Sequence, residues 1–430
     1  MTMNRRDLLR SSGVFLLAGT HAIRQGSLPL RAPLQTHQPD PRARLLEALQ
    51  KSRLPLAMDD GRPSGRGWDW LAQEARASHF TLVGEEHGVA ETAQLSAALF
   101  DTLRGAGYSR MAIELSPLVA QGIETAARRN GLQGILDFFA RPDTWSPMYL
   151  REEAQFLADV VATAPRGERV LWGFDREIFS DRYLIGRLDT KVPPSARASF
   201  AKLKAASANA FALQQKGEGP PFLFAQEPAI VSAVRTAWPN PDRESDTALR
   251  TLEESLAINT VARTGTAWDQ SQRRALWMRS NLAELLTEKS AHRSPPKVML
   301  KAGYNHMIRG ANYVNIFDVG SMPDEAAALR GGRAFHIIVL PGSGSHQAVL
   351  GAGRSFNAVS SEEFDEFKVG DQRLTRVLSN ANATGHEVID LRALRPLAMR
   401  GLESWNADLV RTIHGYDAAV IWKGARASSG

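Results

Sequence analysis

Short apolar runs recur along the chain, each bounded by glycine, proline, aspartate or another polar residue. They are rich in β-branched and large apolar side chains, a pattern that predicts buried β-strands. The runs lie at residues 80–83, 111–115, 170–174, 298–301, 335–340, 387–390 and 418–422. Helical periods at 91–104, 117–129 and 151–163 alternate with the first three runs. This alternation predicts an α/β fold with a mostly parallel sheet covered by helices on both faces.

The segment 176–294 departs from this alternation because it carries helical periods and no apolar strand run. The clearest helical stretches are 196–215, 247–262 and 267–289, and Gly219-Pro220-Pro221 separates the first from the second. We expect a large helical insertion that roofs the carboxyl-terminal edge of the strands and covers a pocket. The α/β catalytic core would then consist of 67–175 and 295–425, preceded by a leader and helix at 23–66.

The first residues resemble an export signal. Residues 4–10 read Asn-Arg-Arg-Asp-Leu-Leu-Arg, and a short apolar run follows at 13–19. Paired arginines before such a run are typical of the twin-arginine pathway, and the run is too short to span a bilayer. We expect a signal peptide at 1–22, a periplasmic or secreted protein and no stable membrane span. An ordinary basic amphipathic N-terminus is the alternative.

Composition narrows the chemistry that the chain can perform. It has 430 residues, no cysteine, 52 Lys+Arg and 46 Asp+Glu. Disulfides, cysteine-ligated metals and a cysteine nucleophile are excluded. The sequence also lacks a Gly-x-Ser-x-Gly elbow, a His-Glu-x-x-His helix and a Gly-x4-Gly-Lys-Ser/Thr loop, which disfavours serine hydrolases, zincins and P-loop enzymes. No basic stripe is interleaved with aromatic residues, so a nucleic-acid partner is not expected.

Ionisable residues follow the first two predicted strands directly. Glu85, Glu86 and His87 lie between Gly84 and Gly88, and Glu114 follows the run that begins at 111. Carboxyl ends of parallel strands meet at one edge of a sheet, where ligands bind. Glutamate and histidine so close together suit acid–base catalysis or metal ligation, and a helix-capping loop is the alternative. Glu114 needs a partner in its apolar surroundings, and His87 is the natural candidate because consecutive strands are often neighbours.

Later strand ends add further polar side chains. Gly303-Tyr304-Asn305-His306 repeats the Gly-x-x-His spacing of the first motif, so His306 is expected to face His87 across a site. Arg309, one helical turn after His306, is a candidate for stabilising an oxyanion or holding an acidic substrate group. Asp175, after the third run, is a candidate orienter or ligand, with a helix N-cap as the alternative.

In their order and spacing, these motifs resemble the erythromycin esterase-like family. That family belongs to a broader group with the Tiki/TraB proteases and the haem-uptake lipoproteins. The resemblance rests on motifs at 80–88, 111–114, 171–175, 303–306 and 415–421, and on Arg274-x-x-x-Met278-x-x-Asn281.

The resemblance implies a hydrolase acting on an ester or similar bond of a small-molecule or peptide substrate. It makes His87 the general base that activates water, with Glu85 and Glu114 positioning or polarising it and His306 assisting at the oxyanion. Arg274 and Asn281 would bind substrate, together with Arg309 and Asp175.

Two alternatives stay open within this resemblance. Only Glu86 separates Glu85 from His87, whereas macrolide esterases typically place two residues there. The shorter spacing looks more like the Tiki and haem-uptake branch. It allows a peptidase or other hydrolase in which Glu86, His87, Glu114 and His306 bind a divalent metal. It also allows a protein that binds haem or another ligand without turnover.

Overall fold

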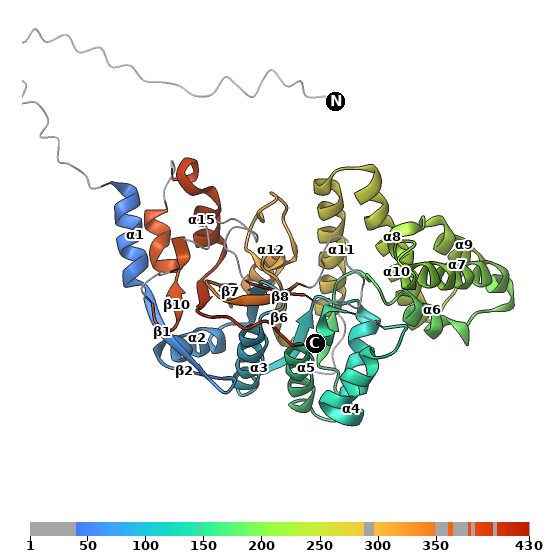
Figure 1. Cartoon of the computed structure of the whole chain (residues 1–430), viewed down its shortest axis with the longest axis horizontal. Helices are drawn as coiled ribbons and strands as arrows, with labels where there is room; N and C mark the ends of the chain where they lie inside the picture. The colour runs from blue at the N-terminus through green and yellow to red at the C-terminus, as the bar shows by residue number, and fades with distance from the viewer. Residues whose placement is uncertain are drawn as a thin grey trace, which may run out of the picture. The chain divides into compact units, whose positions relative to one another are not determined.

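The computed structural model describes residues 40–144, 146–287, 296–348, 360–363, 377–379, 383–398 and 402–429. The expected signal peptide at 1–22 and residues 23–39 of the leader lie outside these ranges. From Pro41 onward the chain forms one unit, in which helices surround a central sheet (Figure 1).

Nine strands of the described chain form one sheet in the order β2-β1-β10-β11-β7-β3-β6-β4-β5. Their bounds are β1 (Arg53–Asp59), β2 (Arg62–Ser64), β3 (Phe80–Glu85), β4 (Tyr108–Ile113), β5 (Leu171–Gly173), β6 (Lys297–Gly303), β7 (Ala334–Pro341), β10 (His386–Asp390) and β11 (Ala418–Trp422). The strands from β11 to β5 in this order run parallel, whereas β10, β1 and β2 pair antiparallel. The predicted mostly parallel sheet is therefore confirmed.

Strands β1 and β2, which were not predicted, form a hairpin at one edge of the sheet. Most of the side chains in β1 are exposed or half-buried, so the segment lacks the apolar run that marks the other strands. Asp60 and Gly61 join the two strands with positive φ angles of 49° and 75°. An Asp-Gly pair is a favoured two-residue hairpin turn and was the signal available in the sequence. A further antiparallel pair, β8 (Ser345–Ala348) with β9 (Ser360–Glu363), lies outside the large sheet.

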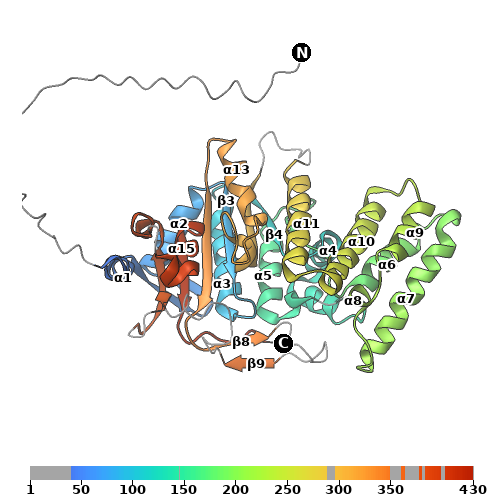
Figure 2. The ribbon, with the colours of Figure 1, turned by 90° about the horizontal axis from the view of Figure 1, so that it is seen from above.

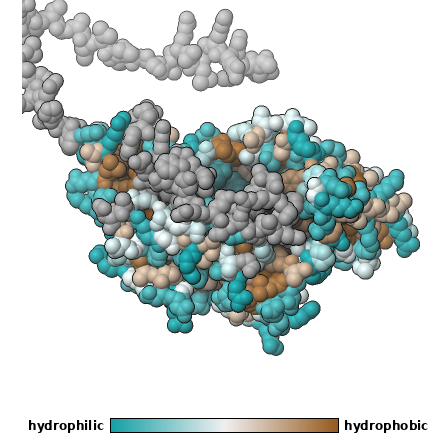
Figure 3. All heavy atoms as spheres, in the orientation of Figure 1, coloured by the Kyte–Doolittle hydropathy of each residue, from teal (hydrophilic) through white to brown (hydrophobic). Residues whose placement is uncertain are grey.

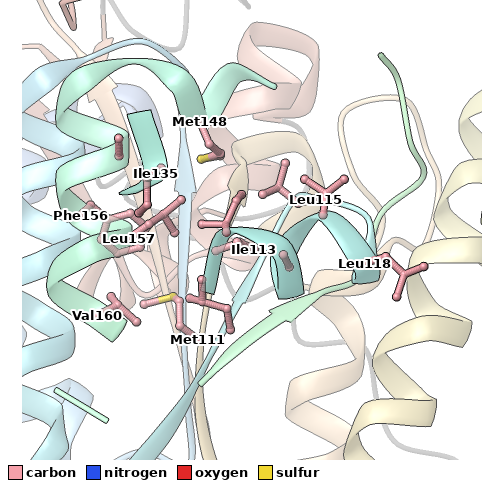
Figure 4. Packing of buried hydrophobic residues seen from close by; sticks show 14 of the residues in the cluster. Met111, Ile113, Leu115, Leu118, Ile135, Met148, Phe156, Leu157 and Val160 are labelled. Carbon is pink, nitrogen blue, oxygen red and sulfur yellow. The ribbon is translucent and has the colours of Figure 1, made fainter. Parts of the chain in front are cut away.

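Helices cover both faces of the sheet, as predicted. One face packs against α2 (Arg66–Arg76), α3 (Ala90–Arg104), α4 (Pro117–Phe139) and α5 (Arg151–Ala162). The other packs against α1 (Pro41–Lys51), α11 (Ala267–Thr287), α13 (Met322–Ala328) and α15 (Glu403–Gly415). Figure 4 shows Met111 and Ile113 of β4 beside Phe156 and Leu157 of α5. Ala112, between them, belongs to the opposite layer, as the alternation of side chains along a strand requires.

The expected helical insertion consists of α6 (Asp181–Asp189), α7 (Arg197–Gln215), α8 (Phe222–Ala225), α9 (Ala229–Ala237), α10 (Arg243–Thr264) and α11. Helices α6 to α10 contact one another, and α6 and α10 contact α4 (Figure 2). The prolines at 220 and 221 separate α7 from α8, as predicted. Helix α11 lies against the sheet and brings Arg274 to the strand ends.

Among the described residues, no helix combines the length and the apolar character that a membrane span requires. Figure 3 shows polar side chains over much of the visible face, with apolar ones in small patches between them.

Candidate active site

Strand β6 lies between β3 and β4, so the expectation that β3 and β4 are direct neighbours is wrong. His87 Nε2 nevertheless lies 3.5 Å from Glu114 Oε2. The contact is possible because β6 ends in Gly303, which has no side chain to separate them. A Cβ on Gly303 would lie 3.3 Å from His87 Nε2 and 3.6 Å from Glu114 Oε2. The backbone N–H of Gly303 instead donates a hydrogen bond of 2.7 Å to Glu114 Oε2.

A buried lysine fixes the carboxylate that orients His87. His87 Nδ1 donates to Glu85 Oε1 at 2.9 Å, and Lys301 Nζ donates to the same oxygen at 2.7 Å. Lys301 also donates to both oxygens of Glu153 on α5, each at 2.9 Å. Burial alone would raise the pKa of Glu85, but the charge of Lys301 and the bond with His87 outweigh it and lower the pKa. Glu85 is therefore held as a carboxylate.

The imidazole of His87 lies between two carboxylates. Burial acts to lower its pKa, but hydrogen bonding and charge from Glu114 and Glu85 raise the pKa well above the ordinary value. His87 is therefore a stable cation in the resting site. Its side chain stays 33% exposed, which leaves the ring accessible from solvent.

Glu114 connects two histidines and an arginine. Its Oε1 lies 3.6 Å from His306 Nε2 and accepts a hydrogen bond from Arg274 Nη2. Burial would raise the pKa of Glu114, but the charges of His306, Arg274 and His87 hold it well below the ordinary value. The two Gly-x-x-His turns therefore meet at one carboxylate, as their repetition suggested.

His306 has its own orienting carboxylate. Its Nδ1 lies 2.8 Å from Asp318 Oδ2, and Asn312 Nδ2 donates to the same oxygen at 3.2 Å. Asp318 is buried. The site therefore contains two carboxylate–histidine pairs, Glu85–His87 and Asp318–His306, with the Nε2 of each beside Glu114.

Asp175 and Asn281 contribute to the site through the residues to which they are hydrogen-bonded, Arg274 and Phe174. Asp175 accepts from Arg274 Nε at 3.1 Å and from Arg274 Nη2, so the guanidinium bridges Asp175 and Glu114. Asn281 is buried and its Nδ2 donates to the carbonyl of Phe174 at 3.1 Å. Arg274 and Asp175, which were predicted to bind substrate, thus position Glu114, and Asn281 fixes the end of the strand that precedes Asp175.

The structure places Arg309 outside the site. The prediction assumed a helix continuing one turn beyond His306. Helix α12 (Tyr304–Met307) ends sooner, and Ile308 is extended with φ −73° and ψ 141°. The Arg309 guanidinium binds Asp324 at 3.0 Å and Asp417 at 3.0 Å. Arg309 therefore fastens the segment after α12 to α13 and to the segment before β11, and that it also holds substrate stays a prediction.

The residues expected to bind a divalent metal do not form a ligand set. Within the described ranges, no group of three or more His, Cys, Asp or Glu side chains is arranged to hold a metal ion. The oxygens of Glu114 already accept from Gly303 and from the charged Arg274, which opposes a second cation at this carboxylate. Burial raises the pKa of Glu86 to about 7, so a proton competes with a cation for this carboxyl near neutral pH. The residues present do not fit the metal.

Sequence reasoning missed four participants: Lys301, Glu153, Asp318 and Arg176. Lys301 is the last residue of a predicted strand run, and a charged residue inside a buried parallel strand was a signal that could have found it. Glu153 and Asp318 carry no comparable signal. Arg176 lies beside Arg274, and burial together with that charge lowers its pKa to about 10. Its buried Nε has no hydrogen-bond partner among the described residues.

Gly303 gives a direct test of this geometry. Its φ of −52° and ψ of 141° suit any residue, so the glycine is needed for space and not for conformation. We expect Gly303→Ala to fold and to lose activity by about tenfold, because the new methyl lies 3.3 Å from His87 Nε2 and moves the ring by a few tenths of an ångström. The readout is kcat/KM together with a thermal melt. The matched control is Gly105→Ala, where φ is −63° and a Cβ meets nothing within 4 Å. Full activity in Gly303→Ala would contradict the placement of the reacting groups.

Comparison with models of known protein families gives no match, and comparison with curated proteins also gives none. Among solved structures, a mutant of the erythromycin esterase EreC in its open conformation aligns with a TM-score of 0.57 at 13% identity, covering 84% of this chain and 94% of that one. A Bacillus cereus protein aligns at 0.55 and 13%, covering 91% and 99%. A succinoglycan biosynthesis protein aligns at 0.54 and 12%, covering 90% and 98%. The chain therefore has the fold of an erythromycin esterase, as the motif resemblance implied.

Proposed function

We propose that this chain is a hydrolase that cleaves an ester or similar bond with a water molecule activated by His87. The observation that supports it most is the pair of histidine Nε2 atoms, 3.5 and 3.6 Å from the two oxygens of Glu114, at the carboxyl edge of a parallel sheet. Each histidine is oriented through Nδ1 by its own buried carboxylate. The fold shared with an erythromycin esterase is consistent with this chemistry.

In the proposed reaction, deprotonated His87 takes a proton at Nε2 from water while the water oxygen bonds to the substrate carbonyl carbon. Glu85 keeps the Nδ1–H in place and stabilises the imidazolium that forms. His306 assists at the oxyanion, with Asp318 fixing its ring through Nδ1. The intermediate then breaks its bond to the leaving oxygen, which takes the proton back from His87. No covalent enzyme intermediate is formed.

The proposal is tested with a panel of esters, lactones and peptides, assayed with and without exhaustive chelation. We expect turnover of an ester or lactone that chelation leaves unchanged. Turnover that is lost on chelation and restored by manganese, cobalt or zinc would favour the metal-dependent alternative. Binding of haem, shown by a Soret band that disappears in His87→Ala, without turnover of any substrate, would favour a binding protein.

The pH profile follows from the position of His87. A general base must be deprotonated, and the raised pKa of His87 means that kcat/KM increases with pH until that raised pKa is passed. Glu85→Gln removes one of the two charges that raise the pKa of His87. We therefore expect the acidic limb of the profile to move to lower pH in this variant, with a smaller plateau. A limb that stays in place or moves to higher pH would contradict the role of His87 as the base.

We also propose that the chain is exported by the twin-arginine pathway, on the basis of the sequence at 4–19. Replacing Arg5 and Arg6 together by lysine keeps the charge and removes the recognition feature. We expect the precursor to accumulate in the cytoplasm, measured by cell fractionation and immunoblotting. Unchanged export of the double variant would exclude this route.

A further inference from the structure

Residues 426–429, which follow β11 and form what we call the clasp, run beside the turn that carries His87. The N–H of Ser428 donates to the carbonyl of Gly88 at 2.9 Å, and the N–H of Gln347 on β8 donates to the same carbonyl at 2.9 Å. A Cβ on Gly88 would lie 2.2 Å from the carbonyl oxygen of Gln347, so β8 approaches this turn closely. The turn is therefore held between β8 and the clasp.

The clasp supplies the N-terminal cap of α3. Val89 stands at the N-cap position, where its apolar side chain makes no capping hydrogen bond. The N–H of Ala90, the first residue of α3, donates instead to the carbonyl of Arg426 at 2.9 Å. Glu91 in turn accepts from Arg426 twice, from the backbone N–H at 3.0 Å and from Nε at 2.7 Å. The start of α3, and with it the turn that carries His87, is therefore fixed by the clasp.

The clasp docks on α5 in the same way. Leu150 at the N-cap position makes no side-chain capping bond, and the N–H of Arg151 donates to the carbonyl of Ser429 at 2.7 Å. Glu152, which is the second residue of α5 as Glu91 is of α3, accepts from the N–H and the hydroxyl of Ser429 at 2.7 and 3.0 Å. Each helix thus gives the clasp one carboxylate and one N–H that has no partner within the helix.

These two helices are attached to the two ends of the hydrogen-bonded chain that orients His87. The turn before α3 carries His87 itself, and α5 carries Glu153, which accepts from Lys301 at 2.9 Å. Lys301 also donates to Glu85 at 2.7 Å, and Glu85 accepts from His87 Nδ1 at 2.9 Å. The helices pack on one another directly, and the clasp adds a link between their N-terminal ends. A shift of α5 relative to α3 would pass through this chain to the imidazole.

We infer that the clasp is a positioning element of the catalytic group, which holds His87 in place against Glu85 by linking the N-termini of α3 and α5. Loosening the clasp costs turnover and not substrate affinity, because a base that is misplaced by about 1 Å loses much of its effect. The inference rests on the proposed role of His87 as the base. The placement of its ring can nevertheless be measured without a substrate, which keeps the two claims separable.

The test removes the two glutamates that bind the clasp, in the full chain. Glu152→Ala removes the acceptor of both Ser429 bonds, and adding Glu91→Ala removes the acceptor of both Arg426 bonds. We expect kcat to fall by about threefold in the single variant and about tenfold in the double variant, with KM unchanged within about twofold. In both, the Nδ1–H proton resonance of His87, assigned by its loss in His87→Ala, should broaden or move upfield as its hydrogen bond weakens.

Glu244→Ala is the matched control. Glu244 is the second residue of α10, and its carboxylate binds Arg187 and Lys191 of the helical insertion. Its loss should leave kcat and the His87 resonance unchanged. An equal fall in kcat in this control, or clasp variants that keep the wild-type kcat or the wild-type resonance, would overturn the inference. A resonance that moves in a protein without turnover would defeat the proposed hydrolase and leave the inference standing. If the double variant does not fold, Glu152→Ala alone decides the outcome.

Discussion

Replacement of His87 by alanine is expected to lower kcat by a factor of about 10² to 10⁴, the range that a positioned general base contributes. The loss follows from geometry, because His87 Nε2 lies 3.5 Å from Glu114 Oε2 and its Nδ1 is fixed by Glu85. The measurement is kcat for the ester or lactone identified by the substrate panel. His414→Ala, which changes an exposed histidine of α15 outside the site, should keep full activity.

The same substitution should also lower stability, in a way that depends on pH. As a polar residue at a strand end, His87 would contribute little to folding. Its place between two carboxylates changes this, because its folded pKa is raised above the unfolded value. The stabilisation is fully present below the unfolded pKa and disappears as pH rises through the folded pKa. Urea unfolding of wild type and His87→Ala should therefore differ most in acid and converge in alkali.

Two outcomes would contradict this account of His87. Activity within a few-fold of wild type in a folded His87→Ala protein would remove it from the catalytic group. A stability difference that grows with pH would mean that the ring is not held as a cation in the folded state. Should the alanine variant fail to fold, His87→Gln keeps an amide donor near Glu85 and allows the kinetic test to be made.

Most of the sheet could be predicted because its strands are apolar runs with polar ends, a purely local signal. The residues that follow those runs could also be predicted to meet, since parallel strands deliver their carboxyl ends to one edge. Glu85, His87, Glu114 and His306 do meet there. The order of the strands could not be predicted from local patterns, because β6, which lies between β3 and β4, comes from a distant segment of the sequence.

The residues that support the two histidines could not be predicted from the sequence, for a physical reason. Asp318 lies in a loop and reaches His306 after the chain turns back through an antiparallel bridge between Ala311 and Phe317. Glu153 belongs to a helix whose pattern is otherwise ordinary, and it is partnered by a lysine from the far-removed strand β6. Such pairs are set by packing between layers. The helical spacing assumed between His306 and Arg309 was wrong, because α12 ends at Met307 and Ile308 is extended.

Lys301→Met is expected to destabilise the fold by about 3–5 kcal/mol, the cost of removing one partner from a buried ion pair. Lys301, Glu85 and Glu153 have side-chain exposures of 0%, 2% and 4%. The ammonium group lies between the two carboxylates, and methionine fills similar space without charge. Two carboxylates would then share a buried site with His87 as the remaining nearby cation. The measurement is the free energy of unfolding in urea.

The stability lost in Lys301→Met depends on pH and on Glu153 if the charge of the lysine matters, and on neither if only its packing does. Without Lys301, the folded-state pKa of a buried carboxyl rises above its unfolded value, so the folded state takes up a proton and the variant regains stability as pH falls. Glu153→Gln should likewise restore part of the loss when combined with Lys301→Met, measured as a coupling energy in a double-mutant cycle.

The control is Lys297→Met, on the same strand but half-buried, which should change stability by no more than about 0.5 kcal/mol. A loss in Lys301→Met that is equal at all pH values, and that Glu153→Gln deepens, would mean that the lysine contributes by packing alone. The orientation of Glu85, and through it of His87, would then need another source.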